Sequence, residues 1–218
     1  RSLYRLMRVV FNMSDAARYS QSGAPRQPVR NICSILCEIF EKAAAATSCG
    51  GITLHYQLPQ DEIFLPLDEE LFERAVLNMV SNAMKFTKKG GTISAKLTSR
   101  GNQFQLTVQD DGSGVAGDVL GTMHRRYQRL PTLEDPRYGL GLGMAMIRAC
   151  ASAHGGVVLI TNPDEGGTRI TMTLTTRRDQ EPTLCDTVIH PDYAGERNHC
   201  LIELSDCLPP ELYSTDLL

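Results

Sequence analysis

The sequence predicts a two-layer α/β sandwich, in which about three helices cover one face of a mixed sheet of about five strands. Segments with helical periodicity are interleaved with short segments of alternating apolar residues. Several of these strand segments follow one another closely enough to pair as antiparallel neighbours. The chain of 218 residues is long enough for one domain with its own core and some additional chain.

The first 47 residues contain two predicted helices. Residues 2 to about 20 form the first, with apolar side chains at helical spacing at Leu3, Leu6, Val10 and Met13. Residues 21–25 (QSGAP) then break the pattern, as a linker does. The second helix is expected from about residue 29 to 47, and Gly50 and Gly51 end it.

Strands and a third helix follow. Alternating apolar residues predict strands at 52–58, 93–97 and 104–108. Between the first two of these strands, Asp68 is expected to cap a helix that runs to about Phe86.

The remaining chain begins with a predicted long loop at 115–138, and loops of this length in compact domains are commonly functional. A helix is expected from about Gly143 to Ala153, followed by strands at 157–160 and 170–174 around a turn at 164–167. After Arg178 the sequence is polar and irregular. Residues 199–205 could add one strand, and residues 179–218 receive no predicted function.

The third helix carries a polar stripe formed by Arg74, Asn78, Asn82 and Lys85. Amide oxygens can ligate Mg²⁺, and a lysine ammonium is a point charge for phosphate. A solvated helix face would carry the same residue types, and the stripe alone favours that simpler interpretation.

An acidic and glycine-rich segment, residues 110–114 (DDGSG), comes directly after a strand that should be buried on one face. A carboxylate at a strand end, such as that of Asp110, can accept a hydrogen bond from an exocyclic amine such as that of adenine. The glycines allow backbone to approach a flat ring closely. An ordinary acidic turn would look the same.

Three alternate glycines, Gly139, Gly141 and Gly143, stand immediately before the helix predicted from residue 143. Exposed backbone N–H groups and a helix N-terminus both favour phosphate. No strand precedes these glycines, which argues against a dinucleotide fingerprint, and no Gly-Lys-Ser/Thr ending supports a P-loop.

In this order and spacing, the motifs resemble the histidine-kinase branch of the ATPases shared with gyrase, MutL and the heat-shock chaperone (the GHKL ATPases). The resemblance covers roughly residues 28–178. Residues 78–87 (NMVSNAMKFT) resemble the N box of that family, 110–115 (DDGSGV) its G1 box and 139–145 (GLGLGMA) its G2 box. Residues 154–156 (HGG) and 167–168 (GT) also match. The resemblance implies the Bergerat-type ATP-binding fold.

The resemblance implies a base pocket in which Asp110 binds the adenine amine. Gly112, Gly114 and Thr168 would shape this pocket, and Phe86 would pack near the ring.

On the phosphate side, the resemblance implies that Asn82, assisted by Asn78, holds Mg²⁺ and that Lys85 contacts phosphate. The phosphate tail would be wrapped by Gly139, Gly141, Leu142 and Gly143, and residues 115–138 would form a lid over the nucleotide.

Two substitutions bear on the chemistry that the resemblance implies. ATP-hydrolysing members carry a Glu as general base where this sequence has Asn78, and an amide cannot take a proton from water. Transfer of the γ-phosphate to a protein nucleophile is therefore favoured over hydrolysis. In the lid, His124 and Tyr127 stand where the family has phenylalanines, and Arg126 and Arg129 keep a charge that could reach phosphate.

Composition excludes several classes of protein. The formal net charge is −3. The sequence has one dense basic stretch, formed by Arg125, Arg126 and Arg129, and this stretch is too short for a nucleic-acid-binding surface. No apolar run is long enough to span a bilayer. The seven cysteines have no metal-ligand spacing and fit reduced thiols. We expect a cytoplasmic protein, or the cytoplasmic part of a membrane-anchored sensor.

The predicted function is Mg²⁺·ATP-dependent transfer of the γ-phosphate to a histidine, as in two-component sensor kinases. None of the five histidines lies in a phosphoacceptor context, so the acceptor helix is expected upstream of residue 1. Residues 1–22 resemble part of the family's dimerisation hairpin, residues 26–178 the catalytic domain, and residues 179–218 an extension. A response regulator and a second copy of the chain are the implied partners.

Two alternatives remain open. The first is an ATP-binding switch whose diverged lid no longer supports phosphotransfer. The second is a serine kinase of the anti-sigma-factor type, against which the N-terminal helix argues.

Overall fold

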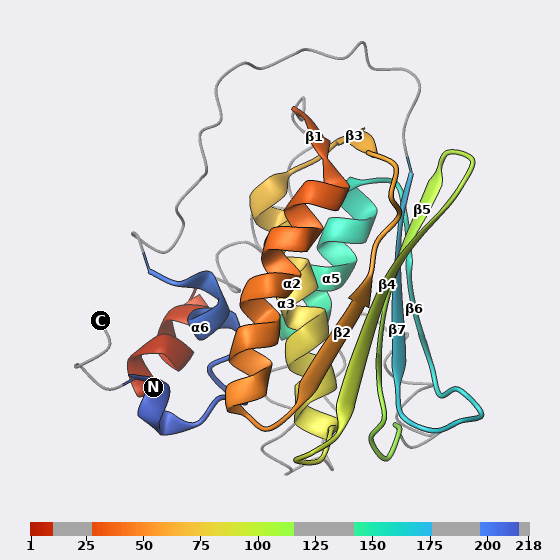
Figure 1. Cartoon of the computed structure of the whole chain (residues 1–218). Coiled ribbons are helices and arrows are strands. Elements are labelled where there is room, and N and C mark those ends of the chain that lie inside the picture. Colours follow the sequence, from red (N-terminus) through yellow and green to blue (C-terminus); the bar gives the residue numbers. More distant parts are fainter. Residues whose placement is uncertain (11–27, 116–141, 176–196, 214–218) are drawn as a thin grey trace.

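The computed structural model of the chain describes residues 1–10, 28–115, 142–175 and 197–213. Its centre is a five-stranded sheet in the order β2-β4-β5-β7-β6, covered on one face by helices α2, α3 and α5 (Figure 1). The strands are β2 (Thr53–Gln57), β4 (Thr92–Arg100), β5 (Gln103–Asp110), β6 (Val158–Thr161) and β7 (Arg169–Thr175). The predicted two-layer α/β sandwich is confirmed.

The sheet is mixed because one of its four pairings is parallel. β2 pairs with β4 in parallel, with Thr53 opposite Thr92, and the other three pairings are antiparallel. Alternation along β5 places Phe104, Leu106 and Val108 in the core, whereas Gln103 and Gln105 are exposed. This alternation is the pattern that made the strands recognisable in the sequence.

Helix α3 (Glu69–Phe86) begins where the sequence predicted. The side chain of Asp68 accepts a hydrogen bond from the backbone N–H of Leu71 at 3.0 Å, which satisfies one of the free donors of the first turn. Val76, Met79 and Val80 are buried in the main core cluster between this helix and the sheet. The polar stripe of α3 therefore faces away from the strands.

Helix α2 (Ile32–Cys49) starts three residues later than predicted. Asn31 caps it, because its side-chain oxygen accepts hydrogen bonds from the backbone N–H groups of Cys33 and Ser34. Residues Val29–Asn31 instead form strand β1, which pairs antiparallel with β3 (Phe64–Pro66) in a separate two-stranded sheet. The predicted end of the helix at Gly50 is confirmed.

His154 ties the end of helix α5 (Leu142–Ala153) to the start of α3. The backbone N–H of Asp68 donates to Nε2 of His154 at 3.2 Å, so Nδ1 carries the proton and donates to the carbonyl oxygen of Cys150 at 2.8 Å. This arrangement requires the neutral ring, and burial lowers the pKa of His154 accordingly. Next to it, a Cβ on Gly156 would overlap the backbone carbonyl of Thr173, so only glycine fits there.

The predicted strand at residues 199–205 is wrong. Residues His199–Glu203 form helix α6, capped by the side chain of Asn198, which accepts from the backbone N–H of Leu201 at 3.3 Å. Cys200 and Leu204, four residues apart, are both buried in the main core cluster. A helix places both side chains on the same face, where they pack into the core, and this packing outweighs the local alternation that had suggested a strand.

The N-terminal helix, residues 2–10, lies beside α6 (Figure 1). Residues 11–27, which include the rest of the predicted helix and the linker, lie outside the described residues, as do most of the predicted loop and residues 176–196. Within the ranges that the structure describes, no helix is both long and apolar enough to cross a membrane.

Candidate nucleotide site

Asp110 ends β5 with its carboxylate held in one orientation. Oδ1 accepts hydrogen bonds from the backbone N–H groups of Gly112 at 2.9 Å and Thr168 at 3.2 Å. Burial raises the pKa of the Asp110 carboxyl, and these two hydrogen bonds oppose that effect. Because both described hydrogen bonds go to Oδ1, Oδ2 is the oxygen that can accept from a bound amine.

Two glycines allow the backbone to close around Asp110. A Cβ on Gly112 would overlap the backbone carbonyl of Phe86 at the end of α3, and a Cβ on Gly167 would overlap the backbone carbonyl of Asp110 itself. Gly167 also has a φ of +78°, a backbone conformation that residues with a Cβ rarely adopt. The segments of the predicted base pocket are therefore packed together, from α3, the end of β5 and the start of β7.

Thr168 adds an unusual polar group to this pocket. Its hydroxyl Oγ1 is buried and has no hydrogen-bond partner among the described residues. A buried hydroxyl without a partner is costly, so a hydrogen bond from a ligand or water to this group would be favourable. Thr168 follows Gly167 directly, and its backbone N–H donates to Oδ1 of Asp110, so the residue lies next to the carboxylate of Asp110.

Asn162 anchors the start of the predicted lid. The backbone N–H of Val115 donates to Oδ1 of Asn162 at 3.1 Å, and Nδ2 of Asn162 donates back to the carbonyl oxygen of Val115 at 2.6 Å. Gly114, one residue earlier, has a φ of +74°. The remaining lid positions, His124 to Arg129 with Arg126 among them, and the glycines Gly139 and Gly141, lie outside the described residues.

The start of α5 meets the polar stripe of α3. A Cβ on Gly143 would lie 2.6 Å from Oδ1 of Asn78, so the backbone of α5 approaches this amide closely. Leu142 opens α5, but its side chain is outside the described part. Asn82, Lys85 and Phe86 on α3 are half-buried. Burial lowers the pKa of Lys85, and the nearby positive charge of Arg8 acts in the same direction.

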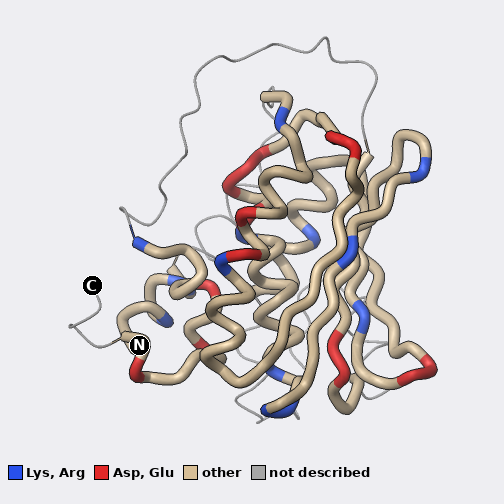
Figure 2. The backbone as a smooth tube through the Cα atoms, in the orientation of Figure 1, with Lys and Arg blue, Asp and Glu red and all other residues tan. Residues whose placement is uncertain are grey.

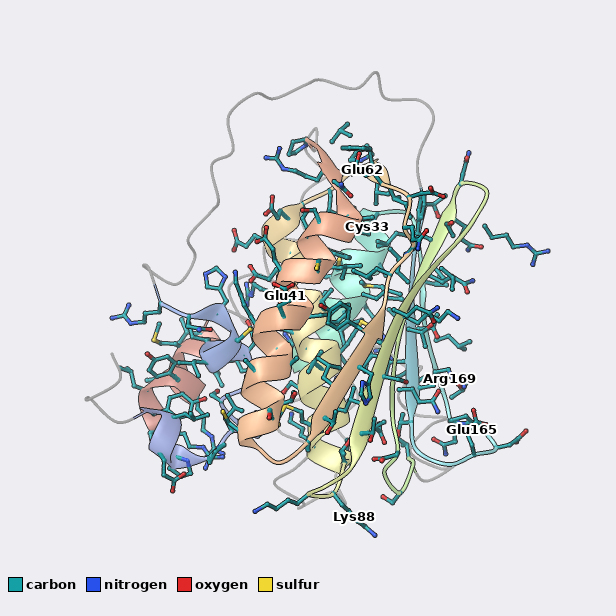
Figure 3. All side chains as sticks on the ribbon, in the orientation of Figure 1. Cys33, Glu41, Glu62, Lys88, Glu165 and Arg169 are labelled. Atoms are coloured by element: carbon teal, nitrogen blue, oxygen red, sulfur yellow. The ribbon has the colours of Figure 1, made fainter. Side chains whose placement is uncertain are left out.

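Figure 3 labels two side chains, those of Glu165 and Arg169, near the end of the sheet that carries the predicted base pocket. Arg169 and Glu165 lie together near the turn between β6 and β7, where Nη2 of Arg169 is 3.2 Å from Oε1 of Glu165. Arg169 is paired with Gln109 in the sheet, and Nε of Arg169 also donates to Oε1 of Gln109 at 2.9 Å. Asp110 follows Gln109, so the base pocket lies at this end of the sheet.

Two residues of the stripe have partners that the sequence did not indicate. Arg74 is buried, and its Nε donates to Oε1 of Glu203 at 3.2 Å. Asn78 is fully buried, and its Nδ2 donates to Oε2 of Glu203 at 3.0 Å and to the carbonyl oxygen of Arg74 at 2.8 Å. The Arg74 and Asn78 end of the stripe is therefore not a solvated face. Glu203 escaped the sequence analysis because it is far from α3 in the chain and belongs to no motif.

Comparison with known proteins identifies the family. The family model described as "Histidine kinase-, DNA gyrase B-, and HSP90-like ATPase" matches residues 67–178, just over half of the chain. The chain belongs to this ATPase family. The match includes α3, the Asp110 segment, α5 and β7, which are the elements that form the site.

Relatives of this ATPase domain include sensor histidine kinases. An uncharacterised sensor-like histidine kinase of Rhizobium meliloti is 30% identical over 151 residues, which are 64% of this chain and 29% of the relative. Histidine protein kinase DivJ of Caulobacter vibrioides is 32% identical over 125 residues, 57% of this chain and 21% of the relative. The chain thus spans less than a third of the length of these relatives.

Solved structures show the same fold. The mycobacterial sensor histidine kinase MprB is matched with a TM-score of 0.57 and 22% identity, over 69% of this chain and 98% of that one. Full-length ShkA in complex with AMPPNP is matched with a TM-score of 0.65 and 22% identity, over 84% of this chain and 38% of that one. This ATPase domain therefore has the α/β architecture of histidine-kinase catalytic domains.

Proposed function

We propose that this domain binds Mg²⁺·ATP and transfers the γ-phosphate to a histidine on a helix of the same protein, upstream of residue 1. The observation that carries the proposal is the fixed carboxylate of Asp110, together with the buried hydroxyl of Thr168, which has no hydrogen-bond partner in the part of the chain that the structure describes. Oδ2 of Asp110 suits an exocyclic amine, and the Thr168 hydroxyl can bind a ring nitrogen through water. Gly112, Gly114 and Phe86 would line the base pocket.

Mg²⁺ would be held on α3. The half-buried amide of Asn82 supplies an oxygen ligand, and the phosphates supply the rest, which is how Mg²⁺ is commonly bound beside nucleotides. Lys85, one turn further along α3, would contact the phosphates. Asn78 would assist, and as an amide it cannot serve as the base for water, so transfer is favoured over hydrolysis.

The phosphate tail would be wrapped by Gly139, Gly141, Leu142 and Gly143, with Arg126 of the lid reaching the γ-phosphate. The close approach of Gly143 to Asn78 supports this arrangement, because it places the start of α5 beside the stripe. A helix N-terminus at this position favours negative charge.

The assignment of the outer segments is part of the same proposal. Residues 1–22 would belong to a dimerisation hairpin, residues 26–178 to the catalytic domain and residues 179–218 to an extension. Leu3, Leu6 and Val10 are 59%, 60% and 53% exposed, so the N-terminal helix has an apolar side free for a partner helix. We also propose a cytoplasmic homodimer and a response regulator that accepts the phosphoryl group from the phosphohistidine.

Phosphotransfer is tested with ATP labelled in its γ-phosphate and the protein extended upstream through the acceptor helix. We expect Mg²⁺-dependent labelling that survives alkali and is lost in acid, as a phosphohistidine is. A hairpin supplied in trans should be labelled as well. Tight ATP binding without any labelling of either form would contradict the kinase and favour an ATP-binding switch, and acid-stable labelling would favour a serine kinase.

The magnesium assignment predicts that Asn82→Ala removes the effect of Mg²⁺ on nucleotide binding. Loss of one metal ligand should lower the affinity for Mg²⁺·ATP by about 10-fold, while the affinity for ATP in EDTA stays the same. Titration with a fluorescent ATP analogue, with and without Mg²⁺, measures both.

Two control variants accompany the Asn82 titration. Asn82→Asp keeps an oxygen ligand and should keep the Mg²⁺ effect. Asn102→Ala removes an amide from the β4–β5 turn, away from the site, and should change neither affinity. A full Mg²⁺ effect in Asn82→Ala would show that the ion is held elsewhere.

A further inference from the structure

The polar stripe of α3 contacts two segments from opposite ends of the chain, the N-terminal segment (residues 1–10, with its helix at 2–10) and the C-terminal segment (residues 197–213). The two segments also hold each other. Nε of Arg1 donates to the carbonyl oxygen of Ser205 at 3.1 Å, and the rings of Tyr4 and Tyr213 meet edge to face with centroids 5.0 Å apart. Figure 1 shows both segments together on one side of the helical layer. We call this pair of segments the latch.

Arg8 is the contact between the latch and the stripe. Its Nη2 donates to Oδ1 of Asn78 at 2.8 Å and to the hydroxyl of Ser81 at 3.2 Å. Its Nε donates to Oε2 of Glu203 at 3.2 Å, and its Nη1 to Oδ2 of Asp206 at 2.8 Å. All three nitrogens of this guanidinium are therefore engaged, and the residue is only 5% exposed.

Glu203 fixes the C-terminal segment in this position. It is fully buried and lies between two guanidinium groups, because Oε1 pairs with Arg74 at 3.2 Å and Oε2 with Arg8 at the same distance. A buried carboxylate with two such partners is held by them, and it is not available as a general base. Figure 2 shows positive and negative positions close together where the terminal segments meet.

These contacts conflict with metal and phosphate at the same side chains. Oδ1 of Asn78 faces a guanidinium, and a Mg²⁺ ion on that oxygen would stand beside a positive charge. Nζ of Lys85 is 3.7 Å from Oδ2 of Asp206, so a phosphate would compete with this carboxylate for the ammonium. The latch thus occupies two of the side chains that the proposed function assigns to metal and phosphate, Asn78 and Lys85.

We propose that the latch is an autoinhibitory contact, which must release Asn78 and Lys85 before these side chains take metal and phosphate. The inference rests on the proposed function, because it assumes that nucleotide phosphates reach α3. Mg²⁺·nucleotide binding and closure of the latch then oppose each other. By reciprocity, nucleotide loosens the N-terminal helix to the same degree that the helix weakens nucleotide binding.

The decisive variant is Arg8→Gln, because the latch and simple electrostatics predict opposite results. Removing a positive charge near the phosphates should weaken the binding of an anion. Opening the latch should instead tighten Mg²⁺·ATP binding, on the order of 5-fold or more. The titration uses a fluorescent ATP analogue with Mg²⁺ on the whole chain, with circular dichroism to verify folding.

Arg5→Gln is the matched control. Arg5 lies on the same helix and carries the same charge, but the described contacts of its side chain are with Asp206 alone, at 3.3 Å for the ion pair. We expect its affinity to stay within about twofold of the wild type, as for a half-exposed ion pair. Unchanged or weaker binding by Arg8→Gln would overturn the latch. No nucleotide binding by the wild type or either variant would overturn the proposed function and the latch with it.

Hydrogen–deuterium exchange on the wild-type chain tests the latch without any substitution. Backbone amides of residues 2–10 and 199–208 should exchange several-fold faster with saturating Mg²⁺·ATP than without it. Exchange that is unchanged or slower with nucleotide would overturn the proposal, because the terminal segments would then remain in place on the bound state.

Discussion

Asp110→Asn should weaken ATP binding by roughly 10- to 100-fold while leaving the fold intact, since it removes a charge-assisted hydrogen bond at nearly constant shape. The structure explains why the amide cannot adapt. The position of Oδ1 accepts from the N–H groups of Gly112 and Thr168, so the oxygen of an asparagine must stay there. Its amino group would then take the place of Oδ2 and present a donor to the donor of adenine.

Asp111→Asn is the control for this experiment. Asp111 is the exposed neighbour, and its Oδ2 accepts from the backbone N–H of Thr92 at 2.8 Å. It carries the same charge next to the same strand end, but it has no part in the base pocket. Competition by unlabelled ATP in a fluorescence titration should show near wild-type affinity for this variant. Equal losses in both variants would indicate a general effect of charge and would contradict the assignment of Asp110.

Gly167→Ala should lower the free energy of unfolding by about 3 kcal/mol or more, because two separate costs add. The left-handed backbone at this residue, with a φ of +78°, disfavours a side chain. In addition, the new Cβ would overlap the backbone carbonyl of Asp110, which cannot move without shifting the end of β5. Urea denaturation followed by circular dichroism measures the change.

Gly166→Ala separates the two costs. Gly166 is the preceding residue with a φ of +98°, and a Cβ there would meet no atom within 4 Å. Only the backbone cost applies, so we expect about 1–2 kcal/mol. If the two variants lose the same stability, the close approach of Gly167 to Asp110 is not what requires the glycine.

The elements of the central fold could be predicted because their signals are local. Asp68 caps α3 through its own side chain, and the alternation along β4 and β5 follows directly from one buried and one exposed face. Asp110, the last residue of β5, and Gly112 could be proposed as pocket residues for the same reason, since they belong to a short motif at the end of a strand.

The elements that were missed depend on distant partners. Strand β1 (Val29–Asn31) forms by pairing with β3 (Phe64–Pro66), which is more than 30 residues away in the sequence. A strand of three residues is too short to show alternating apolar and polar side chains. Helix α6 is helical because Cys200 and Leu204 pack into a core formed by other parts of the chain. The pairing of Glu203 with Arg8 and Arg74 joins residues up to 195 positions apart, and no pattern in the sequence connects them.

The parallel pairing of β2 with β4 has a mechanical consequence for the nucleotide site. Two parallel neighbours cannot be joined by a tight turn, so the chain must cross over between them, and α3 lies within that crossover. The helix that carries Asn78, Asn82 and Lys85 is preceded by β3 of the small two-stranded sheet and followed by β4 of the central sheet, so a strand flanks it at each end. We therefore expect α3 to move little when a ligand binds. The segments that pack against α3 should make the adjustment instead.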